Sequence, residues 1–128
     1  MGAVKSQEQF YLYEAELTAG AGLATSTLPA LQIGSYPFVW EELGAFWNTT
    51  NGDWQIRISD NSGNQYFSSM ECKVAGLVGV EQKPYELKTP YTFLPGSGIM
   101  VEATNDGGAL DTLFLSFIGK RLPSMAVA

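Results

Sequence analysis

Short runs of β-branched and aromatic residues recur along the chain, and glycine, asparagine, aspartate and proline separate them. This spacing is typical of an all-β domain, whereas apolar residues at helical spacing are nearly absent. In residues 10–18, apolar side chains at the odd positions alternate with Glu14 and Glu16 at even positions. Because successive residues of a strand point to opposite faces, one face of this strand is expected to lie in a core.

The pattern predicts a single domain over residues 1–128, with about eight strands and no internal repeat. The expected strands cover residues 10–18, 36–48, 54–59, 65–70, 72–80 (a weak strand), 91–94, 99–104 and 111–120, with an extended segment over 28–33 and a loop over 81–90. Polar, glycine-containing turns at residues 60–64 and 105–108 are expected to close hairpins. An antiparallel jelly-roll sandwich fits this pattern best, and a closed β-barrel is the alternative.

The last expected strand, residues 111–120, is apolar on both faces. Leu113, Leu115 and Phe117 fall on one face, while Phe114 and Ile118 fall on the other. One interpretation is a central strand that is covered by a second sheet on one side and by a loop on the other. The other interpretation is that a neighbouring subunit covers the second face, and the sequence leaves both interpretations open.

Charged residues are scarce in this chain. They make up 16% of the residues, against about 25% in an ordinary soluble domain. Uncharged polar residues and glycine must occupy surface positions instead, and these are less costly to bury against another protein. The composition therefore suits a subunit of an assembly, with buried contacts expected first at residues 113–119 and 19–26.

The net charge of −6 argues against direct binding to nucleic acid, because that affinity comes largely from lysine and arginine. No apolar run approaches the ~18 residues that indicate a membrane span. The first nine residues also lack the apolar segment of a secretion signal. We therefore expect a protein that is made in the cytoplasm and binds neither nucleic acid nor a membrane.

The chain contains no histidine, which removes the commonest general base and metal ligand. An enzyme would have to depend on Glu14, Glu16 or Asp53, and neighbouring carboxylates on one strand usually form a solvated edge. The lone Cys72 has no partner for a disulfide within the chain, so it is interpreted as a half-buried small side chain. No catalytic residue, cofactor or metal is therefore expected.

A group of large aromatic residues in the middle of the chain allows two interpretations. The group consists of Phe38, Trp40, Phe46, Trp47 and Trp54. Such rings line the sugar grooves of carbohydrate-binding modules, and they also fill cores. Phe38 and Trp40 share one parity, which places at least some of the group in the interior.

The C-terminal third contains a pattern that resembles small virion proteins of tailed bacteriophages. Residues 83–85 read KPY, residues 90–98 read PYTFLPGSG, and residues 113–121 read LFLSFIGKR. The aromatic opening strand and the hairpin over residues 54–67 are also similar, so the resemblance covers most of residues 10–122. The terminal strand is its most specific part.

The resemblance implies a jelly-roll or related β protein of the cement, decoration or head-completion type, on the capsid surface of the virion. It implies binding to the major capsid protein, self-association as a dimer or trimer, and neither enzymatic activity nor a cofactor. A neck, tail or fibre-associated adaptor is the alternative location. We expect contacts from the arm over residues 1–9 and the tail over residues 122–128. The individual contact residues are expected to be Phe114, Ile118, Lys120, Arg121 and Leu122.

Overall fold

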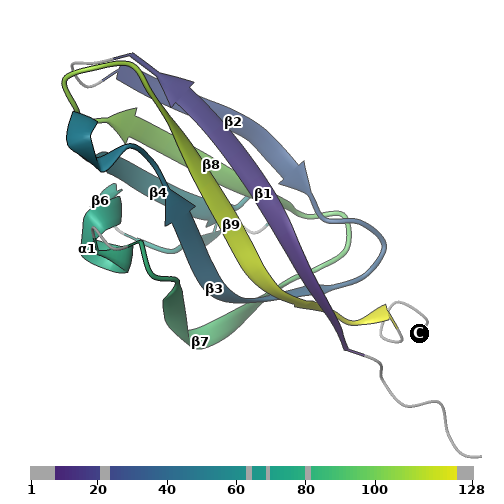
Figure 1. Ribbon diagram of the computed structural model, residues 1–128. Coiled ribbons are helices and arrows are strands. Elements are labelled where there is room, and N and C mark those ends of the chain that lie inside the picture. Colours follow the sequence, from purple (N-terminus) through teal and green to yellow (C-terminus); the bar gives the residue numbers. More distant parts are fainter. Residues whose placement is uncertain (1–7, 21–23, 63–64, 69, 80–81, 124–128) are drawn as a thin grey trace, which may run out of the picture.

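Two antiparallel β-sheets pack face to face in the computed structural model, which describes residues 8–20, 24–62, 65–68, 70–79 and 82–123 (Figure 1). One sheet has the strand order β1-β9-β3-β7, and the other has the order β2-β8-β4-β5, with β6 also paired to β4. The all-β sandwich is therefore confirmed, and neither sheet closes into a barrel. The elements are β1 Gln9–Ala19, β2 Ala24–Gln32, β3 Phe38–Phe46, η1 Thr49–Asn51, β4 Trp54–Asp60, β5 Gln65–Tyr66, β6 Cys72–Lys73, α1 Val74–Val78, β7 Tyr85–Phe93, β8 Gly98–Asn105 and β9 Asp111–Arg121.

The core lies between the sheets and is built from the inward parity of each long strand. On β1 the inward residues include Ala15 and Leu17. Glu14 and Glu16 point outward, as the sequence predicts. On β9 the inward residues Leu113, Leu115 and Phe117 are completely buried. The β1–β9 pairing is continuous from Gln9↔Arg121 to Ala19↔Asp111, so these long strands form one ladder without a register shift.

Strand β9 is a central strand, because β1 and β3 flank it. The second sheet covers its inner face, as the first interpretation of the sequence predicts. That interpretation also predicts a loop over the outer face. No such loop is found among the described residues, and Phe114 on this face is 37% exposed. The outer face of β9 is thus open in the described part of the chain.

The turn at residues 105–108 does not close a hairpin, and this prediction is wrong. Strands β8 and β9 belong to different sheets, so the turn carries the chain across the sandwich. Asn105 is buried, and its amide nitrogen donates to the carbonyl oxygens of Ala19 (2.9 Å) and Ala109 (2.8 Å). Its amide oxygen accepts the backbone N–H of Gly107 at 2.8 Å. The side chain therefore replaces the ladder hydrogen bonds that a hairpin would have supplied.

The hairpin predicted at residues 60–64 is confirmed, because β4 pairs with β5.

The middle of the chain differs most from the sequence predictions. The weak strand expected over residues 72–80 is a two-residue strand, β6, followed by the short helix α1. Gly79 caps the end of this helix with a positive φ of 73°. The loop expected over residues 81–90 instead contains most of strand β7. Pro90 is tolerated there because β7 is an edge strand and its register with β3 shifts at this point. Proline counts alone cannot distinguish an edge strand from a loop.

Candidate interaction surface

The outer face of the β1-β9-β3-β7 sheet carries most of the predicted contact residues. Antiparallel pairing aligns side chains of equal orientation in rows across β1, β9 and β3. The rows are Phe10–Lys120–Val39, Leu12–Ile118–Glu42, Glu14–Ser116–Gly44 and Glu16–Phe114–Phe46. Three of the four rows combine apolar with charged side chains, whereas the row of Glu14, Ser116 and Gly44 has no apolar side chain.

A β-bulge in β3 decides which aromatic side chain reaches this face. Trp40 points inward, and strict alternation would turn Phe46 inward as well, since both positions are even. The register shifts between Trp40 and Glu42, so the following inward residue is Leu43 and Phe46 points outward. The shift leaves Phe46 62% exposed beside Phe114, with ring centroids 6.3 Å apart.

An exposed apolar ridge results, and we define it by Phe46 and Phe114. A hollow lies beside the ridge at Gly44, where the nearest side chains are those of Ser116 and Ile118. A second hollow lies on the other side of the ridge and reaches Leu110, which is 68% exposed. At the opposite end of the sheet, Phe10 is also largely exposed. Exposed apolar side chains that cluster are typical of interaction surfaces, so the ridge is a candidate contact site, while Phe10 lies apart from it.

Five glutamates belong to the strands of this sheet, and two of them lie next to the apolar ridge. The five are Glu14 and Glu16 on β1, Glu41 and Glu42 on β3, and Glu86 on β7. Glu42 and Glu86 lie directly opposite each other on neighbouring strands, and such like-charged pairs repel. Lys120 offsets part of this charge through Glu8 (3.1 Å) and Glu41 (3.6 Å), and its hydrogen bond to Glu8 raises the pKa of the ammonium group. The face therefore has the apolar ridge near one end, with Glu14 and Glu16 next to it, and the carboxylates of Glu41, Glu42 and Glu86 nearer the other end.

The predicted contact residues divide into two groups. Phe114, Ile118 and Lys120 lie together on the outer face. Arg121 has the opposite orientation: its guanidinium packs over the rings of Tyr11 and Tyr36, with 4.6 and 5.4 Å from its central carbon to their centroids, and its Nε donates to Gln9.

The two chain ends are only partly described. Leu122 is held at the end of the sandwich by a hydrogen bond from its backbone N–H to the carbonyl of Pro37. Gln9, which was assigned to the N-terminal arm, is in fact the first residue of β1. Residues 1–7 and 124–128 of the predicted arm and tail lie outside the described residues, as do residues 21–23 of the stretch 19–26.

The sequence missed Phe10, Leu12 and Phe46 as members of this surface. The first two were visible as apolar residues on the polar parity of the opening strand. Phe46 had no local signal, because its orientation depends on the bulge.

The candidate tryptophans do not form a stacking platform on the surface. Trp40, Trp47 and Trp54 are buried, and each indole N–H donates to an oxygen of the chain. Asp53 accepts the backbone N–H groups of Trp54 and Ala75, which is a structural role. Across the described ranges, no three His, Cys, Asp or Glu side chains lie close enough together to hold a metal ion.

No protein-family model, curated protein or solved structure matches this chain. Within the described residues, no helix has the length and apolar character that crossing a membrane requires.

Proposed function

We propose that this protein is a non-enzymatic structural protein of a phage virion. In this role it is a cement or decoration subunit that bridges neighbouring copies of the major capsid protein on the capsid surface. The resemblance of the terminal strand to such proteins supports the proposal. The observation that carries it is the open outer face of the four-stranded sheet, with its exposed apolar ridge.

The chemistry of this face describes the partner. An apolar ridge requires an apolar groove, and the carboxylates on the same face favour lysine or arginine on the partner beside that groove. The face is poorly suited to a second copy of itself, because its glutamates would oppose one another. A dimer or trimer of this chain would therefore use another surface, and the outer face would remain free for the capsid.

The strand order supports a jelly roll as the finer description of the fold. Apart from the connections between β4, β5 and β6, every connection between strands passes from one sheet to the other. A jelly roll combines two Greek keys in this way, and it is common in viral capsid proteins.

Copy number in purified virions tests the location. A cement subunit is expected in hundreds of copies per particle, measured by quantitative mass spectrometry against the major capsid protein. A count near five or twelve would contradict the capsid proposal and favour the neck or tail adaptor. Complete absence from the particle would contradict both.

Reattachment to shells that lack the protein tests the outer face. The double variant Phe46→Ser/Phe114→Ser should keep its circular dichroism spectrum and lose attachment, because both rings are already partly exposed. Leu94→Ser is the matched control, since Leu94 is also 62% exposed and lies in the turn between β7 and β8. Attachment of the double variant at the level of the control would overturn the role of the ridge.

A further inference from the structure

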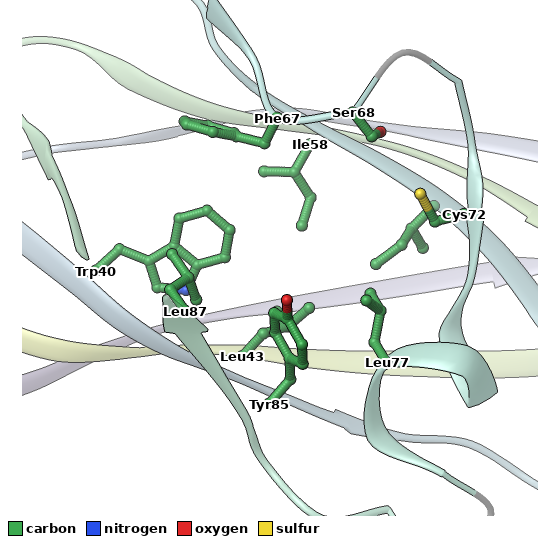
Figure 2. A pocket seen from close by; sticks show the side chains of 10 residues that line it. Trp40, Leu43, Ile58, Phe67, Ser68, Cys72, Leu77, Tyr85 and Leu87 are labelled. Carbon is green, nitrogen blue, oxygen red and sulfur yellow. The ribbon is translucent and has the colours of Figure 1, made fainter. Parts of the chain in front are cut away.

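An apolar pocket lies between the sheets, away from the outer face (Figure 2). Its volume is about 240 Å³. Strands β3 and β7 form one wall, β4 forms the opposite wall, and β6, α1 and the segment after β5 close the side. The lining residues are Trp40, Leu43, Ile56, Ile58, Phe67, Ser68, Cys72, Leu77, Tyr85 and Leu87.

The pocket exists because one edge of the second sheet is interrupted. Strand β7 has nine residues, but β5 and β6 have only two each, and they pair with opposite ends of β4. A full-length strand beside β4 would fill the space beneath Tyr85 and Leu87 with its own side chains. The short helix α1 contributes only Leu77 to this space, so part of the space stays unfilled.

One polar group is aimed into this apolar space. Figure 2 shows the hydroxyl of Tyr85 pointing into the middle of the pocket, between Leu77 and Leu87. The hydroxyl of Ser68 and the thiol of Cys72, by contrast, each donate to the backbone carbonyl of Met70. The pocket thus combines carbon walls with one hydroxyl group available to a ligand, as small-molecule sites do.

We propose that this pocket binds a small, neutral aromatic molecule that carries one hydrogen-bond acceptor. Apolar cavities of about 150 Å³ take up benzene, so the larger pocket here suits a substituted ring. The ring would pack against Trp40 and Leu77, and the acceptor would receive the proton of the Tyr85 hydroxyl. A charged ligand does not fit, because none of the described lining residues carries an opposite charge to pair with it. The proposal is independent of the virion role.

Two nearly isosteric probes test both parts of the proposal. Acetophenone carries a carbonyl acceptor where α-methylstyrene carries a methylene group. In NMR titrations of the full chain we expect saturable shifts with both probes, and acetophenone binding about five- to tenfold tighter through one hydrogen bond. Tyr85→Phe should remove this difference while retaining binding of α-methylstyrene.

Filling the pocket supplies the control. Leu77→Trp should abolish binding of both probes, whereas Leu94→Trp adds the same ring at an exposed position outside the pocket and should leave binding unchanged. Cys72 lines the pocket and is the chain's one cysteine, so its alkylation rate in the wild-type protein reports occupancy without any substitution. Acetophenone should slow alkylation in the wild-type protein.

Three results would overturn the proposal. The first is a lack of saturable binding of either probe, and the second is binding that Leu77→Trp leaves unchanged. The third is loss of particle attachment in Leu77→Trp while neither probe binds, which would assign the pocket to a side chain of a protein partner. Equal affinity of the wild-type protein for the two probes would contradict the hydrogen bond from Tyr85 to the ligand.

Discussion

At the residue scale, the glycine of the terminal LFLSFIGKR segment has a packing role. Gly119 lies on β9, opposite Tyr11 on one side and Trp40 on the other. A Cβ atom at this position would lie only 1.8 Å from the carbonyl oxygen of Val39, which is backbone and cannot rotate away. The close approach occurs where the bulge in β3 brings the two strands together. This part of the motif is therefore explained by the fold without reference to a partner.

Gly119→Ala should lower the free energy of unfolding by about 3 kcal/mol, because β3 and β9 must separate to admit the methyl group. Urea unfolding followed by tryptophan fluorescence measures the change. Gly76→Ala is the matched control: Gly76 lies inside α1 with open space around it, so alanine there should be neutral or stabilise by up to about 1 kcal/mol. Equal effects of the two substitutions would contradict the clash.

Tyr91 and Asp60 join the two sheets through one short hydrogen bond. The Tyr91 hydroxyl on β7 donates to the carboxylate of Asp60 on β4 at 2.7 Å, and the other oxygen of this buried carboxylate accepts from Ser62. Burial, followed by the bond to Asp60, raises the pKa of Tyr91 to about 12. Tyr91→Phe should therefore cost about 1–2 kcal/mol of stability at neutral pH.

The raised pKa gives this pair a pH signature. The folded-state pKa of Tyr91 exceeds the ordinary value of 10.0, so its contribution is complete below pH 10 and is lost as pH rises toward 12. Unfolding measured across this range should show a steeper decline for the wild-type protein than for Tyr91→Phe. Parallel curves for the two proteins would rule out the linkage.

At the element scale, the connection between β8 and β9 depends on one buried amide. The amide nitrogen of Asn105 donates two hydrogen bonds to backbone carbonyls, and its amide oxygen accepts one from a backbone N–H. No residue of the same shape can make all three bonds. The neighbouring Asp106 contributes differently. It pairs with Lys73 on the surface, and that hydrogen bond lowers the pKa of Asp106.

Asn105→Asp should destabilise the fold by about 2–4 kcal/mol at neutral pH, because a carboxylate would face two carbonyl oxygens. Lowering the pH should restore part of the lost stability, since a protonated carboxyl group can donate one of the missing hydrogen bonds. Thermal unfolding at neutral and acidic pH measures both effects. Asp106→Asn serves as the control and should have a much smaller effect, because its ion pair is solvent-exposed.

At the scale of the whole molecule, charge and apolar surface are unevenly distributed. The outer face of β1-β9-β3-β7 combines the exposed ridge with several glutamates, on a chain whose net charge is −6. If this face meets a basic partner, long-range attraction should speed encounter, and salt should weaken it. The apolar ridge would then hold the complex after encounter.

Glu16→Gln/Glu42→Gln should slow association with shells that lack the protein and flatten its dependence on ionic strength. The dissociation rate should change less, because rim charges act mainly on encounter. Surface plasmon resonance at low and high salt measures both rates. Asp106→Asn removes a carboxylate near the second sheet and is the control. Identical salt dependence for all three proteins would exclude steering by this face.

The residue pattern alone predicted the all-β class, most of the long strands and the inward parity of β1 and β9. Alternation is a local property of a strand, and these strands carry no shift in their own apolar pattern. From this alternation the sequence predicted that Leu113, Leu115 and Phe117 are buried and that Glu14 and Glu16 point outward. It also predicted that the second face of β9 is apolar.

Only the tertiary structure decided which strands share a sheet, where β3 changes phase and that a proline-containing segment forms β7. These features depend on pairing between residues far apart in the chain, such as Leu17 with Leu113. The bulge turned Phe46 outward to complete the ridge, and the interrupted edge beside β4 opened the pocket. Both candidate sites therefore arise where the chain departs from regular pairing, because a local pattern carries no information about such departures.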